Sequence, residues 1–142
     1  MMSIEIDMLH PIDPSSLDIR EVREATGGKF ALCGNVNQAF PLAFGSPEGV
    51  CLETLRMLRD IAPGGGYLLG SGHSCQDYLR PENYLAMIDT ALEFGRYSID
   101  IPDATLRAAE QAAEQAPRHF DLSYENMPEQ PALARFYERI IT

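Results

Sequence analysis

The sequence GGGYLLGSGH occupies residues 64–73 of the chain. Its apolar run, Tyr67–Gly70, stands between glycine-rich segments and is too short for a helix, so it predicts a buried strand. The glycines before the run are expected to terminate one helix, and the polar loop after it leads into another. A short apolar strand between two helices is typical of a parallel α/β sheet.

Both flanking helices have recognisable ends and an apolar face. The first begins at Ser46–Pro47, an N-cap followed by proline at the first helical position, and Pro63–Gly66 ends it. The second opens at Pro81 and is closed by Gly95. Apolar residues recur at spacings of three and four, which predicts an inward face on each helix. The expected inward residues are Cys51, Leu55, Leu58 and Ala62 in the first helix and Tyr84, Leu85, Ile88 and Leu92 in the second.

A further helix and two more strand signals precede this region. Apolar and acidic residues alternate over Ile4–Leu9, and a second apolar run, Phe30–Cys33, ends at Gly34. Between them, Asp18 is the expected N-cap of a short helix that Gly27–Gly28 ends. Strands and helices alternate along the chain. This alternation predicts an α/β fold with parallel strands and right-handed helical connections. The inward residues of the short helix are expected to be Ile19, Val22 and Ala25.

Residues 102–142 depart from this pattern and are interpreted as a helical C-terminal extension to the strand–helix units of residues 1–101. Asp103 is expected to cap a polar, alanine-rich helix that runs to about Gln115. A loop follows, and Pro131 begins a last predicted helix. The apolar residues of this last helix that are available for packing are Leu133, Phe136, Tyr137 and Ile140.

The composition narrows the class of protein. The chain has 142 residues, enough for one ordinary domain, and carries 11 basic against 21 acidic side chains for a net charge of −10. Such an acidic chain repels a phosphate backbone, so a nucleic-acid partner is not expected. The sequence shows no signal peptide and no apolar stretch of membrane-spanning length, and the odd number of cysteines favours reduced thiols. We therefore expect a cytoplasmic protein without a membrane partner.

Chemistry is expected where the strands end. In a parallel sheet, all the loops that follow the strands lie at one edge, where α/β proteins place their sites. The loops His10–Pro14, Gly34–Asn37 and Ser71–Asp77 should meet there. His73 is the first catalytic candidate, because an imidazole donates to a carboxylate or carbonyl and moves protons near neutral pH. A histidine that only caps loop backbone groups fits the same position equally well.

Cysteines near these loops suggest a metal site. Cys33 ends one strand, and His73 and Cys75 stand in the loop after the next. Thiolate and imidazole are ligands that zinc prefers, and three protein ligands with an open position make a catalytic zinc site. The spacing is not a zinc signature, however, and a buried cysteine beside a loop histidine is the more common arrangement.

Six spaced segments of the chain form an ordered set of motifs over about residues 4–100. They are Leu9–Pro14, Gly34–Asn37, Gly65–Leu69, Gly72–His73, Arg80–Asn83 and Glu93–Tyr97. Together these segments resemble, in the same order, the closing motifs of the uroporphyrinogen decarboxylase superfamily, and the set is more specific than any one segment alone. The resemblance implies that the chain forms the last three strand–helix units of a TIM (β/α)₈ barrel.

The resemblance also implies a site. His73 matches the substrate-facing histidine of the decarboxylases, and Asn35 and His10 are expected to bind substrate beside it. In the related cobalamin-dependent methyltransferases, a zinc-binding cysteine occupies the place of His73. Because this chain has histidine there, the resemblance argues against the same zinc site in this chain. Asn37 and Ser74 stand where the decarboxylases have aspartate and glycine. The substrate implied is a tetrapyrrole or a methyl donor, and the candidate cofactors are zinc and a corrinoid.

Three interpretations of function remain open. A complete barrel has eight strands and ~250 residues, so the first is an enzyme part that needs the missing N-terminal units for tetrapyrrole decarboxylation or corrinoid-linked methyl transfer. Its open sheet edges predict self-association as a homo-oligomer or pairing with a complementing N-terminal barrel chain. The second is a non-catalytic module that binds a corrinoid or a metal. The third is an inactive truncated fragment.

Overall fold

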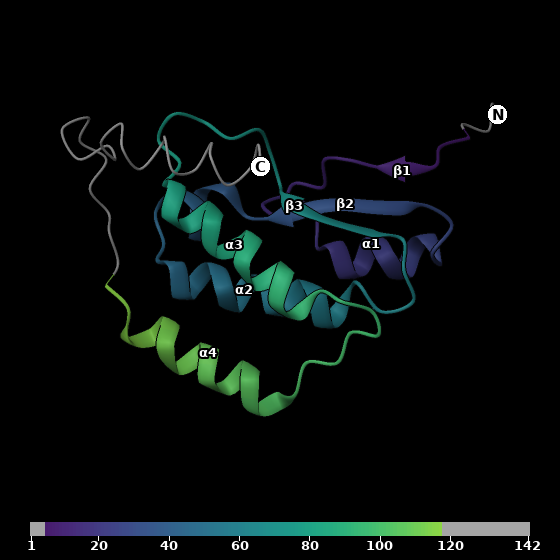
Figure 1. Cartoon of the computed structure of the whole chain (residues 1–142). Helices are drawn as coiled ribbons and strands as arrows, with labels where there is room; N and C mark the ends of the chain where they lie inside the picture. The colour runs from purple at the N-terminus through teal and green to yellow at the C-terminus, as the bar shows by residue number, and fades with distance from the viewer. Residues whose placement is uncertain (1–4, 118–142) are drawn as a thin grey trace.

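The computed structural model of the chain describes residues 5–117. Three parallel strands form its sheet in the order β1-β2-β3, with β2 in the centre (Figure 1). Leu32 of β2 aligns with Leu9 on one side and with Tyr67 on the other. The predicted parallel α/β sheet is confirmed. The strands are β1 (Met8–Leu9), β2 (Ala31–Val36) and β3 (Tyr67–Ser71).

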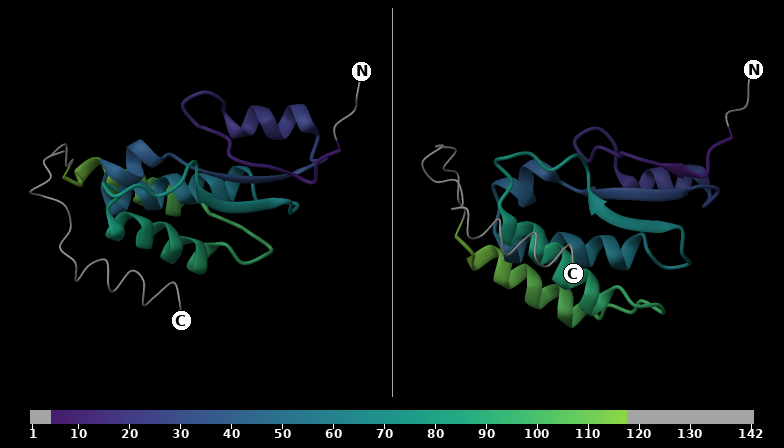
Figure 2. Two further views of the ribbon diagram at one scale, coloured as in Figure 1. Left: turned by 90° about the horizontal axis from the view of Figure 1, so that it is seen from above. Right: turned by 45° about the horizontal axis from the view of Figure 1, so that its top comes forward.

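Helices cover one face of this sheet. In Figures 1 and 2, α1, α2 and α3 lie in one layer against the strands, and α4 lies beyond them beside α2. A short kinked helical segment, η1 (Gln38–Ala43), joins β2 to α2. None of the helices within the described residues is long and apolar enough to cross a membrane. The helices are α1 (Ile19–Thr26), α2 (Pro47–Asp60), α3 (Pro81–Phe94) and α4 (Asp103–Gln115).

Side-chain caps fix the helix ends much as the sequence predicts. The Asp18 carboxylate accepts a hydrogen bond from the Arg20 N–H at 2.8 Å, which caps α1. The Ser46 hydroxyl oxygen accepts a hydrogen bond from the Gly49 N–H at 3.2 Å, which caps α2. Gly27 ends α1 with φ of 57°, a left-handed conformation that favours glycine.

Some predicted boundaries are wrong. The first strand is shorter than predicted. Only Met8–Leu9 pairs with β2, and the Asp7 carbonyl accepts a hydrogen bond at 2.8 Å from the N–H of Ala31, where β2 begins; residue 4 lies outside the described residues. β2 continues beyond Gly34, since the residues that follow it still pair with β3. α2 ends at Asp60, ahead of the proline and glycines expected to stop it, and α4 is capped by Pro102 rather than by Asp103.

Some of the predicted inward residues are also wrong, although Ile19 of α1 is buried and Val22 packs against the same core cluster, as predicted. Ala25 of α1 is exposed, and Leu92 of α3 is 66% exposed. Instead α3 buries Asn83, Met87 and Thr90. The apolar spacing of α3 fits two adjacent faces, and its packing against both α2 and η1 selects the face that contains Met87.

α2 is buried on two sides. Met57 and Ile61 pack with Leu32 against the sheet. The face that the sequence indicated, formed by Leu55, Leu58 and Ala62, packs instead against Ile101 and Leu106 at the start of α4. Apolar contact therefore holds α4 in place. The helix predicted to begin at Pro131 lies outside the described residues.

The other face of the sheet has no cover within residues 5–117 (Figure 1). Met8 is 46% exposed and Leu68 is 50% exposed. The period of two along strands places Ala31 and Cys33 on the same face as these two residues. Exposed apolar side chains in a row along a sheet face mark a surface that another protein segment covers.

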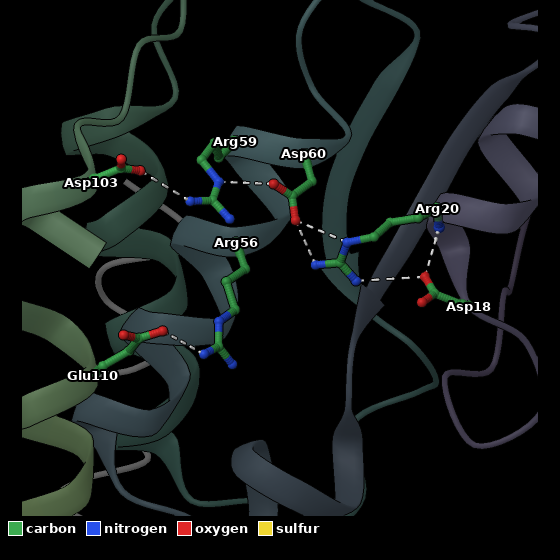
Figure 3. Close-up of polar contacts among 7 residues, drawn as sticks. All are labelled: Asp18, Arg20, Arg56, Arg59, Asp60, Asp103 and Glu110. Atoms are coloured by element: carbon green, nitrogen blue, oxygen red, sulfur yellow. Dashed lines mark hydrogen bonds and ion pairs between the residues drawn. The ribbon is translucent and has the colours of Figure 1, made fainter. Parts of the chain in front are cut away.

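A chain of ion pairs connects the helix layer from α1 to α4 (Figure 3). Asp60, at the end of α2, accepts hydrogen bonds from Arg20 of α1 and from the neighbouring Arg59, each at 2.9 Å from the Nε atom. Arg59 also lies 3.7 Å from Asp103 of α4. Burial alone raises the pKa of Asp60, but the hydrogen bonds from Arg59 and Arg20 outweigh it and hold that pKa below its ordinary value.

Replacing Asp60 by asparagine is expected to lower the free energy of unfolding by about 1 kcal/mol near neutral pH. Because the folded-state pKa is depressed, this contribution is present above the unfolded value of 3.8 and is lost as the pH falls through the folded pKa. Urea denaturation over a series of falling pH values measures the difference between the two proteins. The difference in free energy of unfolding between the unmodified chain and Asp60→Asn should narrow in acid. For the exposed control Asp100→Asn, the difference from the unmodified chain should stay near zero at every pH.

Candidate functional site

The loops that follow the three strands meet around one cavity of 210 Å³. The loop after β1 contributes Asp13, η1 after β2 contributes Gln38, and the loop after β3 contributes His73 and Tyr78. The expected convergence of these loops at the carboxyl ends of the strands is therefore observed. The remaining lining residues are Pro14, Ser15, Ala39 and Gly72.

His73 is exposed and held by its own loop. Its Nδ1 atom accepts a hydrogen bond from the Ser74 N–H at 2.9 Å, and the Ser71 hydroxyl donates to the His73 carbonyl at 2.6 Å. A neutral imidazole that accepts at Nδ1 carries its proton on Nε2. The loop therefore orients the ring and leaves Nε2–H as the donor that a bound molecule can meet.

Asp13 places a carboxylate in the same cavity. The Ser15 N–H and hydroxyl both donate to its Oδ1, at 2.9 and 2.8 Å. These two hydrogen bonds lower the pKa of Asp13, with a smaller contribution from the nearby positive charge of His73 when that ring is protonated. Both bonds fall on Oδ1, which leaves Oδ2 as a further acceptor. The cavity thus combines an ionised acceptor with an imidazole donor.

Asn83 holds the segment that brings Gln38 to the cavity. Its side chain is 0% exposed, and its Nδ2 lies 3.2, 2.9 and 3.0 Å from the carbonyl oxygens of Pro41, Leu42 and Gly45. An amide group that donates to several carbonyls fixes the turn that follows η1. Asn83 stands at the start of α3, so the fold couples the loop after β3 to the segment after β2.

The aromatic wall of the cavity is positioned by stacking. The rings of Tyr78 and Phe44 lie with centroids 5.9 Å apart and planes inclined by 12°. Tyr78 lines the cavity, and Phe44 follows η1 directly. Stacking of this kind restrains the Tyr78 ring. Gly72, which also lines the cavity, is packed tightly against the loop after β1, since an added Cβ would lie 2.9 Å from Cδ of Pro14.

Two residues predicted to bind substrate lie away from this cavity. The His10 Nδ1–H donates to the Cys33 carbonyl at 3.2 Å and so bridges the end of β1 to β2. Asn35 is 2% exposed and lines a separate cavity of 330 Å³ beside Arg20 and Glu53. Its buried Oδ1 has no hydrogen-bond partner within the described part of the chain. The structure therefore brings only His73, of the three predicted residues, to the cavity where the loops converge.

The predicted zinc ligands do not come together. Within residues 5–117, no group of three or more histidine, cysteine, aspartate or glutamate side chains is arranged to hold a metal ion. Cys33 is half-buried on the sheet, and Cys75 is exposed, with its thiol hydrogen-bonded to Tyr84. The set of Cys33, His73 and Cys75 is thus not a ligand set in this fold. Ligand type alone suggested this set.

No sequence signal marks Gln38 and Tyr78 as site residues. Each lies in or beside a loop that was expected at the site, but neither side chain is distinctive in isolation. The stacked Phe44 is equally unmarked, because aromatic residues in loops are found as often in packing as in sites. Gln38 reaches the cavity through η1, a kinked turn that periodicity does not reveal, and Tyr78 reaches it from the loop after β3.

A parallel sheet with helices on one face and a loop-lined cavity at its carboxyl edge defines part of a layered α/β protein, of the kind from which α/β barrels are built. Residues 1–94 match the uroporphyrinogen decarboxylase (URO-D) family, and the chain belongs to this family. α4 lies beyond the matching residues.

Known relatives carry the same family name. The chain is 33% identical over 79 residues to the uroporphyrinogen decarboxylase of Neisseria meningitidis serogroup C, covering 56% of this chain and 22% of that protein. It is 36% identical over 74 residues to the uroporphyrinogen decarboxylase of Nitrosomonas europaea, covering 52% of this chain and 20% of that protein. The chain therefore spans about a fifth of the length of these relatives. No solved structure matches it significantly.

Proposed function

We propose that this chain supplies the last three strand–helix units, and with them His73, to a tetrapyrrole carboxy-lyase of the uroporphyrinogen decarboxylase kind. The observation that carries the proposal is the cavity at the carboxyl edge of the sheet, where loops from all three strands bring His73 and Asp13 together. The relatives that match the chain are named as uroporphyrinogen decarboxylases, which supports a tetrapyrrole as substrate.

The polar groups of the cavity suit this chemistry. Loss of CO₂ from a carbon atom leaves a position that must gain a proton, and a histidine in its imidazolium form, with Nδ1 released from the Ser74 N–H, can deliver one from Nε2. The Nε2–H group donates equally well to a substrate carboxylate. Asp13 is ionised, because its hydrogen bonds lower its pKa, and a carboxylate accepts from the N–H groups of pyrrole rings.

The missing barrel units belong to the proposal as a partner. The sheet has an uncovered face with Met8 and Leu68 exposed on it, and β3 has no neighbour on its outer edge within residues 5–117. A barrel closes such edges and fills its interior with side chains from all its strands. We infer that a chain carrying the preceding five units covers this face and contributes the cations that a polyanionic substrate requires.

Complementation tests the proposal. The Nitrosomonas europaea enzyme, shortened by the segment that this chain matches, would be co-expressed with the full chain, and loss of carboxyl groups from uroporphyrinogen would be measured. We expect activity only when both chains are present. Co-purification without any decarboxylation would reject the assigned reaction. Failure of the two chains to associate would reject the assembly from two parts.

A further inference from the structure

The cavity of 330 Å³ that Asn35 lines lies between the loop after β1, the start of α1, β2 and α2. Its volume falls within the range of about 300–1,000 Å³ that is usual for small-molecule pockets. Ile19 and Met57 belong to the buried core and give the cavity apolar walls. The cavity adjoins the one that contains His73, because Ser15 lines both of them.

Asn35 brings an unpaired acceptor to this cavity. The residue lies in β2 and is 2% exposed, and its Oδ1 atom has no hydrogen-bond partner among residues 5–117. Buried side-chain oxygens in folded proteins are normally paired, because burial removes them from water at a cost that only a donor repays. An occupant of the cavity with an N–H or O–H group would supply that donor.

The charges on the cavity wall favour a cation. Glu53 of α2 is half-buried there, and Arg20 is the only cation among the described residues that line the cavity. The Arg20 guanidinium is directed at other carboxylates (Figure 3). Its Nε and Nη2 lie 2.9 and 2.7 Å from Oδ2 of Asp60, and its Nη1 lies 3.5 Å from Oδ1 of Asp18. An anion would be repelled by Glu53, whereas a positive charge would be attracted to it.

We propose that this cavity binds a small primary ammonium with a short apolar body. An ammonium group carries three N–H donors and one positive charge, so it can donate to Oδ1 of Asn35 and pair with the Glu53 carboxylate. The apolar body suits the walls that Ile19 and Met57 form. A metal ion fits less well, because residues 5–117 contain no group of three or more histidine, cysteine, aspartate or glutamate side chains arranged to hold one.

An NMR titration of the full-length chain tests the site. The probe is n-butylammonium, compared with 1-butanol, which has the same size and no charge, and with butyrate, which is an anion. Salt at about 0.15 M screens attraction to exposed carboxylates. We expect saturable shifts at the Asn35 side-chain amide and the Ser15 N–H with the ammonium alone. Shifts that do not saturate, that spread over the surface carboxylates, or that 1-butanol produces equally would overturn the proposal.

Two substitutions assign the contacts. Glu53→Gln keeps the shape and removes the charge, and Asn35→Leu keeps the approximate size and removes the acceptor. Each should weaken n-butylammonium binding about tenfold or more. Glu48→Gln, an exposed position on the same helix, is the matched control and should bind as the unmodified chain does. If Asn35→Leu fails to fold, Glu53→Gln decides alone, and unchanged affinity in that variant would overturn the proposal.

Hydrogen exchange locates the ligand independently. The Ser15 N–H and hydroxyl hold Asp13, and the N–H groups of Ser16 and Leu17 donate to the Asp13 carbonyl, so this loop is a compact unit on the cavity wall. We expect n-butylammonium to slow amide exchange at residues 15–17 several-fold and to leave residues 109–115 of α4 unchanged. Equal effects on both segments, or no slowing at residues 15–17, would contradict binding in this cavity.

Discussion

Replacing His73 by glutamine is expected to lower the decarboxylation rate of the complemented enzyme by about 10²–10⁴-fold, the usual contribution of a positioned acid or base. Glutamine keeps an N–H donor near the position of Nε2 but cannot transfer a proton near neutral pH. The substitution therefore separates proton transfer from hydrogen bonding to a substrate carboxylate. The rate is measured as carboxyl loss from uroporphyrinogen by the two-chain assembly.

Ser74→Ala is the matched control for this experiment. The His73 ring accepts its hydrogen bond from the backbone N–H of Ser74 rather than from the hydroxyl, so alanine keeps the contact that orients the imidazole. We expect the control to retain most of the activity. A rate for His73→Gln close to that of the unmodified assembly would remove His73 from proton transfer and leave it a binding role at most.

Replacing Asn83 by alanine is expected to reduce the free energy of unfolding by about 2–4 kcal/mol, the range for loss of a buried polar network together with a small cavity. The Asn83 side chain is fully buried, and its amide nitrogen serves three backbone carbonyls around the turn after η1. Alanine removes this donor from all three carbonyls, of which that of Pro41 still accepts from the Gly45 N–H at 3.0 Å. Urea or thermal denaturation of the full chain measures the loss.

Asn83→Asp sharpens this prediction. The shape is nearly unchanged, but a carboxylate would replace the amide donor and face three carbonyl oxygens. Aspartate should therefore destabilise the chain at least as much as alanine at neutral pH, and less in acid, where a protonated carboxyl can donate. Gln111→Ala, an exposed amide on α4, is the control and should change little. Small effects from both Asn83 variants would show that this hydrogen-bond cluster does not hold the turn.

Local rules predicted the elements of the fold well. The caps at Asp18, Ser46 and Gly27 and the prolines at the helix starts are short-range signals, and their helices begin and end close to the predicted places. The apolar runs likewise marked two of the strands. The predictions that failed depend on tertiary packing. The exposure of Leu92 and the second buried side of α2 follow from where α3 and α4 pack, which spacing alone does not specify.

The candidate site was likewise predictable only in part. That the loops after the strands would converge follows from parallel topology, and the position of His73 in the cavity follows from it as well. The separation of Asn35 from that cavity does not follow from parallel topology. Asn35 lies within β2, paired with Gly70 of β3, but Gly34 before it has a φ of 120°, so the alternation of faces along a regular strand does not tell on which side its amide lies. The predicted zinc set failed for a related reason, because sequence shows which ligands exist but not their distances.

The most direct test of the account is amide hydrogen exchange of this chain with and without a chain that carries the missing barrel units. The account predicts that Tyr67–Ser71 of β3, whose outer edge lacks a neighbouring strand within the described residues, becomes strongly protected when the two chains are mixed. Helix α4, away from the sheet, should exchange as before. Unchanged exchange in β3, with the two chains remaining separate, would contradict the central claim that these units close a barrel.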